Sequence, residues 1–471
     1  MKNKIVYKYI GKVLIGFSIL LLIPLIVACI YKEHISPFLI PLLISLLFGF
    51  ILNTLKISSQ KIYSKDGFII VALSWIIISI ISSLPFIINK ELAPVDALFE
   101  SISGLTTTGA SVFTDVESLD KSILFWRSFM HFIGGMGVLA FVMAIIPLSK
   151  NDKSMHLLKA EMPGPSVNKL VPSIKKTLFY LYGIYIFLTL LEFILLIVGK
   201  TSPFHALLLS FGTAGTGGFS LLNNSLASYT TFSKIVVTIF MFLFGVNFNI
   251  FFLILMKDFK SAFKSEELRV YLFIYLASVL LIVLNTYKLF DNLSECILEG
   301  FFHISSLITS TGYSIGSIDI YPTNAKVLCL MLMLISACAG STCGGFKMSR
   351  LIICFKSIKR DILKIIHPNS IRCIKFEGND VPEDTINSTR SFLFLYIIFI
   401  IIIMFVVSID GYSFEITLNA VFSTFANVGL AFDISSFSIF SNISKIFLSI
   451  GMLLGRLEIF PIIVLFSDLK K

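Results

Sequence analysis

Thr106-Thr107-Thr108-Gly109-Ala110 is the first of four short polar segments that decide the fold of this chain. The other three are Ala214-Gly215-Thr216-Gly217-Gly218, Thr309-Ser310-Thr311-Gly312-Tyr313 and Ala426-Asn427-Val428-Gly429-Leu430. Each follows an amphipathic stretch too short to cross a bilayer, and each is flanked by two longer apolar stretches. Extended backbone at membrane depth is tolerated only where it lines a cavity or is buried in protein. We therefore expect the four segments to converge on one central pathway.

The composition indicates a helical membrane protein with many spans. Of the 471 residues, 56% are hydrophobic and 14% are charged, and the mean hydropathy is +0.91. Soluble domains carry about a quarter charged residues. Apolar runs of about 20 residues recur along the chain, each long enough to span a bilayer. The first run, 13–29, lacks a small-residue cleavage site and leads into a second span, so we expect no cleaved signal peptide.

Lysines and arginines are concentrated in alternate loops. The net charge is +10, and the basic loops are 2–12, 56–65, 150–176, 257–269 and 347–375. The positive-inside rule places these loops, and with them both termini, in the cytoplasm. Membrane orientation accounts for the basic charge, so we expect the lipid bilayer and no nucleic acid as a partner.

A four-fold repeat follows two opening spans, 12–30 and 37–55. Each repeat holds an outward span, a half-helix, a polar strand and an inward span. The outward spans are predicted at 67–88, 178–198, 270–289 and 391–409. The half-helices are predicted at 95–105, 203–213, 293–308 and 413–425. The inward spans are predicted at 123–148, 233–256, 325–355 and 444–466.

These repeats give an all-α polytopic fold with four parallel repeats around one pore and two extra N-terminal helices. Every half-helix falls on the lysine-poor side, whereas an inverted-repeat transporter would alternate its broken segments between the two sides. The predicted divisions are 1–62 for the N-terminal helices, 63–150, 151–258 and 259–358 for the first three repeats, and 359–471 for a cytoplasmic loop and the fourth repeat.

The four strands offer oxygen atoms to a cation. Threonine presents a carbonyl and a hydroxyl oxygen, and glycine adopts the positive φ that turns a carbonyl toward the axis. The C-terminal end of each half-helix is partly negative and favours a cation. One such strand is typical of a loop turn, but four at equivalent places indicate a filter. The candidate filter residues are Thr107, Thr108, Gly109, Gly215, Thr216, Gly217, Ser310, Thr311, Gly312, Asn427, Val428 and Gly429.

The third inward span is interrupted by small and polar residues, Gly340-Ser341-Thr342-Cys343-Gly344-Gly345. They suit either a close helix-packing face or a flexible intramembrane loop below the filter. Because three glycines and two hydroxyls cluster within one or two turns, we favour the loop.

Arg456 lies inside the last predicted span, and an ionisable residue there indicates function. It either faces the pore as a fixed positive charge or pairs with an acid such as Glu458. Glu100, in the first half-helix, either holds that helix to a neighbour or enriches cations at the pore mouth with Asp115 and Asp433.

Neither catalysis nor a covalent cofactor is expected. The seven cysteines form no CxxC pair, and the six histidines show no metal-ligand spacing. The glycine-rich run 212–218 lacks the strand–helix context of a nucleotide site. A membrane-embedded enzyme would need acids or histidines clustered at membrane depth, and the sequence gives no such cluster.

The chain resembles the Trk/Ktr/HKT superfamily of potassium transporters, in particular its TrkH type, over essentially its whole length. The matching stretches are 99–110, 126–127, 134–137, 161–165, 216–219, 267–269, 340–345, 367–368, 427–429 and 455–458. Two N-terminal spans favour the TrkH type over the shorter Ktr type. Cys343 stands where alanine is expected and Leu430 where proline is common.

The resemblance implies a pseudo-tetrameric pore like that of a potassium channel. It also implies a homodimer that is gated by a cytoplasmic nucleotide-binding regulatory subunit of the TrkA type. By analogy, the filter glycines are Gly109, Gly217, Gly312 and Gly429, residues 340–345 form the gate, and Arg456 is the charge below the filter.

The expected function is potassium uptake across a prokaryotic cytoplasmic membrane, driven by membrane potential, with or without coupling to Na⁺ or H⁺. Each strand has one key glycine and not a full TVGYG, so we expect weaker K⁺/Na⁺ discrimination than in a dedicated potassium channel. The alternatives are a less selective K⁺/Na⁺ channel and a secondary transporter of a small organic solute.

Overall fold

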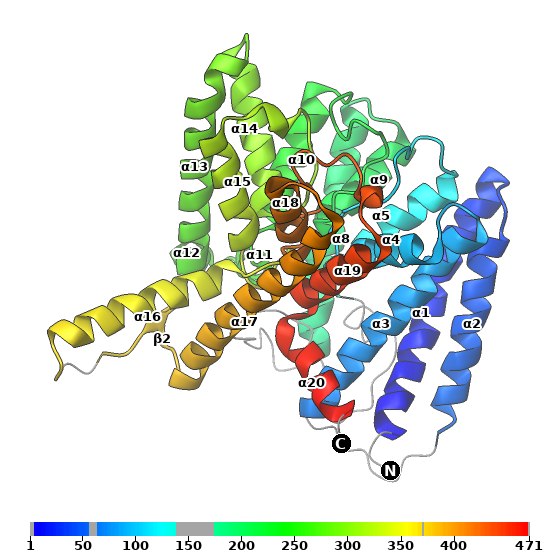
Figure 1. Cartoon of the computed structure of the whole chain (residues 1–471), viewed down its shortest axis with the longest axis horizontal. Coiled ribbons are helices and arrows are strands. Elements are labelled where there is room, and N and C mark those ends of the chain that lie inside the picture. Colours follow the sequence, from blue (N-terminus) through cyan, green and yellow to red (C-terminus); the bar gives the residue numbers. More distant parts are fainter. Residues whose placement is uncertain (1–3, 56–63, 138–173, 370–371, 470–471) are drawn as a thin grey trace.

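Two long apolar helices open the chain and lie side by side at one edge of the molecule (Figure 1). They are α1 (Lys4–Tyr31) and α2 (Ser36–Asn53). Gly11 and Gly49 let the two backbones approach closely, since a Cβ on Gly49 would lie 3.1 Å from the carbonyl oxygen of Gly11. The Ser45 hydroxyl donates a hydrogen bond to the Leu14 carbonyl at 2.8 Å. The pair packs against the first repeat through α3 and α5.

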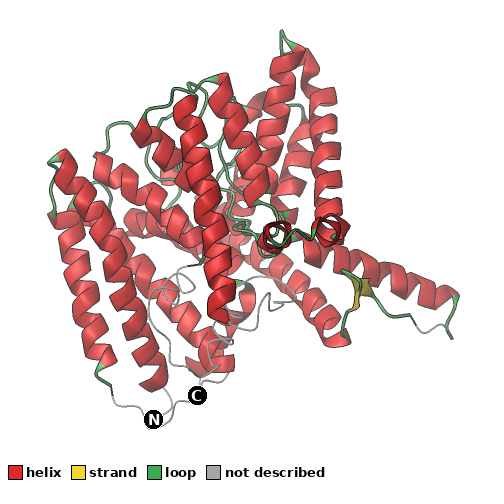
Figure 2. Cartoon of the chain, turned by 180° about the vertical axis from the view of Figure 1, so that it is seen from behind, coloured by secondary structure: helices red, strands yellow, loops and turns green. Residues whose placement is uncertain are grey.

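The computed structural model describes residues 4–55, 64–137, 174–369 and 372–469, and these are mostly helical (Figure 2). The outward helices of the four repeats are α3 (Ser64–Ile88), α8 (Ile174–Val198), α13 (Glu266–Thr286) and α17 (Glu383–Val407). With α1 and α2 they make the 6 helices of the described residues that are long and apolar enough to cross a membrane. The structure therefore confirms the predicted outward spans.

The four half-helices lie within two residues of their predicted limits. They are α4 (Pro94–Leu105), α9 (Pro203–Gly215), α14 (Leu293–Ile308) and α18 (Phe414–Phe425). Local sequence explains where several of them begin. Proline stands at the start of α4 and α9, where its missing N–H costs nothing. The Ser413 hydroxyl caps α18 by accepting a hydrogen bond from the Ile416 N–H at 3.3 Å.

The inward spans differ from the prediction, which expected only the third to be interrupted. In the second repeat, α10 (Thr231–Phe244) and α11 (Phe248–Leu255) meet at 92°. In the fourth, α19 (Asn442–Leu457) and α20 (Ile459–Leu469) meet at 114°. Asn247 caps α11, and Glu458 adopts φ +63, so each bend has a local cause.

The interruption predicted in the third repeat is a loop. Helix α15 (Thr323–Ile335) ends before residues 336–347, and α16 (Met348–Ile366) begins after them. Of the two interpretations of residues 340–345, the structure therefore supports the loop and not the helix-packing face. In the first repeat α5 (Lys121–Gly135) is followed by two described residues, and the rest of that predicted span, 138–148, lies outside the described residues, as does the stretch 161–165.

Smaller elements join the repeats. They are α12 (Phe259–Lys264), four 3₁₀ turns (Tyr287–Leu289, Ile318–Ile320, Ser408–Asp410 and Phe437–Ile439) and a hairpin of β1 (Lys375–Phe376) and β2 (Asn379–Asp380). The hairpin is antiparallel, with Lys375 opposite Asp380 and Phe376 opposite Asn379.

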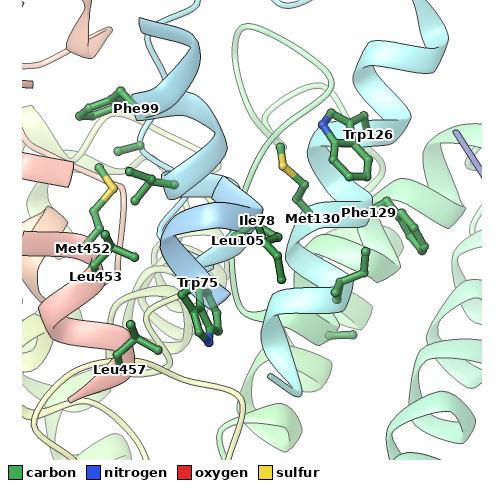
Figure 3. Close-up of a cluster of buried hydrophobic side chains, with 14 of the residues drawn as sticks. Trp75, Ile78, Phe99, Leu105, Trp126, Phe129, Met130, Met452, Leu453 and Leu457 are labelled. Carbon is green, nitrogen blue, oxygen red and sulfur yellow. The ribbon is translucent and has the colours of Figure 1, made fainter. Parts of the chain in front are cut away.

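Half-helix α4 is surrounded by large buried side chains from the elements around it (Figure 3). Trp75 of α3, Phe99 of α4, Trp126 of α5 and Met452 of α19 belong to this core. Trp126 also donates its indole N–H to the Ser82 carbonyl of α3 at 3.1 Å. Apolar packing, together with the Trp126 hydrogen bond, thus holds α4 in place and fixes the position of the segment that follows it.

A candidate ion pathway lined by four strands

Each half-helix ends in the same backbone turn. We call the four segments that make it, 106–109, 215–218, 309–312 and 426–429, the ring segments. Their second residues all take a left-handed conformation: Thr107 (φ 55), Thr216 (φ 54), Ser310 (φ 51) and Asn427 (φ 56). Their last residues are glycines at positive φ: Gly109 (82), Gly218 (72), Gly312 (84) and Gly429 (78). A non-glycine residue pays roughly 1–2 kcal/mol for such a conformation, so four repetitions are not accidental.

The same hydrogen bond holds every turn. The N–H of the third residue in each ring segment donates to a carbonyl five positions back in the half-helix. The four pairs are Thr108 to Ser103 (2.8 Å), Gly217 to Gly212 (2.9 Å), Thr311 to Ser306 (2.8 Å) and Val428 to Ser423 (2.8 Å). The half-helices therefore fix the backbone of the ring segments directly.

The ring segments close on one another in chain order. A Cβ on each terminal glycine would overlap a carbonyl oxygen of the next segment. The four pairs are Gly109 with Gly217 O, Gly218 with Thr311 O, Gly312 with Val428 O, and Gly429 with Thr108 O. Each glycine is therefore required both by its positive φ and by this close approach. The result is a closed circle of four backbones, as the sequence predicted.

The second segment has a different register from the predicted one. The prediction placed Gly215-Thr216-Gly217 beside Thr107-Thr108-Gly109, whereas the structure places Thr216-Gly217-Gly218 there. Half-helix α9 continues to Gly215, two residues beyond its predicted end, and this shifts the turn by one position. Gly215 instead packs against the backbone of His131.

Side chains brace the ring segments from behind. The hydroxyls of Thr106 and Thr108 lie 2.8 Å apart, and those of Thr309 and Thr311 lie 2.7 Å apart. The fourth segment has no hydroxyl, and Asn427 supplies the contact there. Its amide donates to the Thr108 hydroxyl and to the Met452 carbonyl, both at 2.9 Å.

A cavity of about 160 Å³ lies at one end of the ring, which we call the outer mouth; all four ring glycines and Arg127 are among its lining residues. Arg127 forms a buried ion pair with Glu100 at 2.9 Å and lies 4.2 Å from the centre of the Phe219 ring. Glu100 also accepts a hydrogen bond from the Val112 N–H at 3.0 Å. Of the two interpretations of Glu100, this geometry supports the contact that holds α4 to its neighbours.

The two other acids predicted at the mouth lie in exposed loops. Asp115 accepts a hydrogen bond from Asn223 at 2.9 Å, and this bond lowers the pKa of Asp115. It is therefore charged at neutral pH. Asp433 lies 3.9 Å from Lys326, which partly balances its charge.

The 336–347 loop lies against the opposite side of the ring from the mouth. Its Gly344 N–H donates to the Ser310 hydroxyl at 3.1 Å, and a Cβ on Gly344 would press on Asn427. Thr342 and Cys343 are fully buried. The candidate gate residues 340–345 therefore lie together under the ring.

Arg456 binds this loop through its guanidinium group. The group donates to the Thr342 carbonyl, and on its other side to the carbonyls of Gly134 and, at 2.7 Å, Gly135. Glu458, the partner suggested by sequence, instead forms an ion pair with Arg350 of α16. Arg456 also lines a small cavity of about 50 Å³ together with Gly340 and Ser341.

Sequence reasoning missed two buried groups near this pathway. The Lys347 ammonium is 1% exposed and donates to the Cys343 carbonyl. His131 lies 2.8 Å from the Gly104 carbonyl and accepts a hydrogen bond from the Phe219 N–H at 3.1 Å, so it braces the backbone beside the second ring segment. Sequence could have singled out both residues, because each is a basic residue within a predicted apolar span, where ionisable side chains are rare.

Comparisons with known proteins agree with this architecture. Residues 34–470 match the family described as TrkH, cation transport protein. The chain is 34% identical to the Trk system potassium uptake protein TrkG of Escherichia coli (strain K12), over 96% of this chain and 95% of that protein. It is 32% identical to TrkH of Salmonella typhimurium, over 99% of both. The crystal structure of the potassium transporter TrkH from Vibrio parahaemolyticus superposes with a TM-score of 0.86 at 28% identity, covering 99% of this chain and 98% of that one.

Proposed function

Because this chain belongs to the TrkH family of cation transport proteins, we propose that it takes up potassium ions through the ring segments. The observation that carries the proposal is the closed circle in which each ring glycine faces a carbonyl oxygen of the next segment. Such oxygens replace the water that a cation loses when it enters a narrow pore. The names of the relatives support potassium as the ion.

In this proposal a hydrated ion enters the cavity at the outer mouth and sheds its water onto the carbonyls of Thr108, Gly217, Thr311 and Val428. The partly negative C-terminal ends of the four half-helices lead directly into the ring segments and would stabilise a cation there. The buried Glu100–Arg127 pair adds little net charge at the mouth. Backbone geometry, and not a charged side chain, is therefore the source of affinity.

The 336–347 loop would be the gate, with Arg456 as the charge below the ring. A positive group beside the path raises the barrier for a cation, and the contacts from Arg456 and Ser310 hold the loop in place. Opening would require the loop to leave these contacts.

Membrane potential would drive accumulation. An inside-negative potential favours each inward charge by about 2.3 kcal/mol per 100 mV, with or without coupling to Na⁺ or H⁺. The distribution of lysine and arginine supports a prokaryotic cytoplasmic membrane orientation with both termini inside. A homodimer and a cytoplasmic nucleotide-binding regulatory subunit of the TrkA type complete the proposal, and both rest on family resemblance.

The test is uptake by the purified full chain in liposomes, paired with rescue of a strain that lacks its own potassium uptake. We expect K⁺ flux above Na⁺ flux, and rescue that Gly312→Ser removes because the new Cβ would overlap the Val428 carbonyl. Sodium preferred over potassium, or unchanged uptake by Gly312→Ser, would contradict the proposal.

One observation favours a less selective K⁺/Na⁺ channel as the second candidate. The first and third ring segments each have a pair of bonded hydroxyls, whereas the fourth has none. Uneven bracing would let the circle adapt to a smaller ion. Equal K⁺ and Na⁺ flux in the same liposomes would favour this candidate.

A further inference from the structure

The 336–347 loop has a second anchor, on the side away from the ring. Glu267, in the first turn of α13, is 3% exposed. One of its carboxylate oxygens accepts a hydrogen bond from the Ala339 N–H at 2.7 Å. The other accepts one from the Asn247 amide at 3.2 Å. A single buried carboxylate thus joins the loop of the third repeat to the bend of the second.

The bend and the loop also touch directly. The Phe248 N–H donates to the Gly340 carbonyl at 3.1 Å, and the Cys338 N–H donates to the Gly245 carbonyl at 3.1 Å. The start of the loop is therefore held by the α10–α11 bend and by Glu267 together. Any movement of Glu267 changes the position of Ala339.

A second carboxylate connects Glu267 to the β1–β2 hairpin. Glu377, in the hairpin turn, accepts hydrogen bonds from the Ser265 hydroxyl at 2.8 Å and from the Glu267 N–H at 2.9 Å. It thereby caps the N-terminus of α13, where a negative charge is stabilised. The hairpin therefore holds the same helical turn that carries Glu267.

Lys356 of α16 ties the hairpin further to this corner. It donates to the Lys375 carbonyl at 2.6 Å and forms an ion pair with Glu266 at 2.5 Å. Figure 1 shows the hairpin beside α16. The hairpin, the start of α13 and the helix that follows the loop are therefore one connected unit.

There is room for the loop to move toward this unit. A cavity of about 570 Å³ is bordered by Ala339, Glu267, Asn247 and Glu377. Among the described residues that line it there is no lysine or arginine. The buried hydroxyl of Ser349 also lines it and has no hydrogen-bond partner there. Polar groups around an open space allow a backbone segment to shift without losing all its hydrogen bonds.

We propose that Glu267 is a positioning residue for the 336–347 loop, and that Glu377 lets the hairpin set its position. The proposal rests on the proposed function, in which the loop controls the ion path. The positive-inside rule places the hairpin in the cytoplasm, within reach of a soluble protein. A protein that binds the hairpin would then move Glu377, and through it Glu267 and the 336–347 loop, without contacting the ring segments.

The experiment measures exposure of Cys343, which is fully buried in the loop. In the full chain, with the other cysteines replaced, we would measure its modification by a water-soluble methanethiosulfonate in liposomes, alongside K⁺ flux. Glu267→Ala should raise the modification rate about tenfold, the factor expected when one hydrogen bond to a charged group is lost. Glu377→Ala should raise it in the same direction, and the double variant should not exceed Glu267→Ala alone.

Conservative variants separate positioning from folding. Glu377→Gln keeps the one oxygen that accepts from the Ser265 hydroxyl and the Glu267 N–H, so it should stay near the wild-type rate. Glu267→Gln keeps an acceptor for the Ala339 N–H but turns its own amide N–H toward the Asn247 amide, so its rate should lie between those of the wild type and Glu267→Ala.

Asp380→Asn is the matched control, because in the described structure that hairpin carboxylate has no hydrogen bond to α13. A variant that fails to fold would show a lower thermal midpoint and aggregate on size-exclusion chromatography. If Glu267→Ala fails to fold, the Cys343 modification rates of Glu377→Ala and Glu377→Gln still test the proposal, because only the alanine variant should raise the rate.

Three outcomes overturn the proposal: an unchanged Cys343 rate in Glu267→Ala, effects of the two alanine variants that multiply, or glutamine variants that behave like alanine. The measurement of K⁺ flux tests the proposed function separately from these three outcomes. If the wild-type chain carries no K⁺ while Cys343 responds as expected, the proposed function fails and the connection between hairpin and loop stands.

Discussion

The ring segments and the 336–347 loop are neighbours, but they are held in different ways. The ring uses one backbone turn four times, with the same hydrogen bond and the same glycine in each repeat. The loop occurs in the third repeat alone among the described inward spans. It is held by side chains from other elements, including Arg456 and Glu267, and by two backbone hydrogen bonds to the α10–α11 bend that no other repeat shares in the described residues. Backbone repetition suits the fixed filter that we propose for the ring, and exchangeable side-chain contacts suit the moving gate that we propose for the loop.

This contrast has an energetic basis. A ring glycine cannot gain a Cβ without colliding with the next backbone, so the ring has one stable arrangement. Each loop contact contributes only a few kcal/mol and can be exchanged for another. In the proposed gate, a small bias applied through one of those contacts would be enough to shift the loop between closed and open positions.

The largest effect should come from breaking the ring. Gly218→Ala would place a Cβ against the Thr311 carbonyl in a backbone conformation of φ +72. We expect K⁺ flux in liposomes to fall by about 100-fold or more, because strain and overlap together exceed roughly 3 kcal/mol. Gly183→Ala is the matched control, since nothing lies within 4 Å of a Cβ there. Equal flux in the two variants would mean that Gly218 is not part of the ion path.

Sequence predicted the long elements well because each has a simple signal. The outward spans are strongly apolar, and the half-helices are short and amphipathic. Three of the half-helices begin at proline or serine, and α14 begins after Asn292. The bends after Phe244 and Leu457 were missed because long apolar stretches surround each break, so that Asn247 and Glu458 look like isolated polar residues within one span. Hydropathy alone does not distinguish a bent span from a straight one.

The register and the pairings within the candidate site could not be predicted from the sequence, because they depend on contacts between distant parts of the chain. The run Gly215-Thr216-Gly217-Gly218 offers three glycines for one position, and only the length of α9 decides among them. Arg350 and Glu458 are 108 residues apart, so their pairing depends on the tertiary fold. The filter and gate roles of the predicted residues stay predictions, which the following variants address.

The next effect should come from freeing the loop. Arg456→Ala removes a fixed positive charge and the contacts to Thr342, Gly134 and Gly135. We expect K⁺ flux to rise about tenfold, since hydrogen bonds to charged groups are worth roughly 1.5–3 kcal/mol each and some will be replaced by water. Arg456→Lys keeps the charge but cannot make the same set of contacts. If K⁺ flux rises in Arg456→Ala but not in Arg456→Lys, the positive charge itself is the barrier. If flux is unchanged in both variants, Arg456 has a structural role.

A smaller increase is expected from Lys347→Met. This buried ammonium donates to the Cys343 carbonyl, next to the one that Arg456 binds. Methionine fills similar space without the charge, so one loop contact is lost and flux should rise about threefold. Lys359→Met, on the exposed part of α16, is the control and should leave flux unchanged. Reduced flux with an unaltered thermal midpoint would show that Lys347 keeps the path open.

The smallest effect should be on ion preference within the ring. Among the described residues, Asn427 makes the only side-chain hydrogen bond between two ring segments, from the fourth to Thr108 of the first. Asn427→Ser removes that contact and the one to the Met452 carbonyl, and serine is the residue that the third segment has at the same left-handed position, Ser310. We expect the K⁺/Na⁺ flux ratio to fall about twofold, because the two lost neutral hydrogen bonds loosen the fourth segment while the backbone turn and the circle persist. Exposed Asn292→Ser provides the control, and an unchanged ratio in Asn427→Ser would show that backbone turns alone set ion preference.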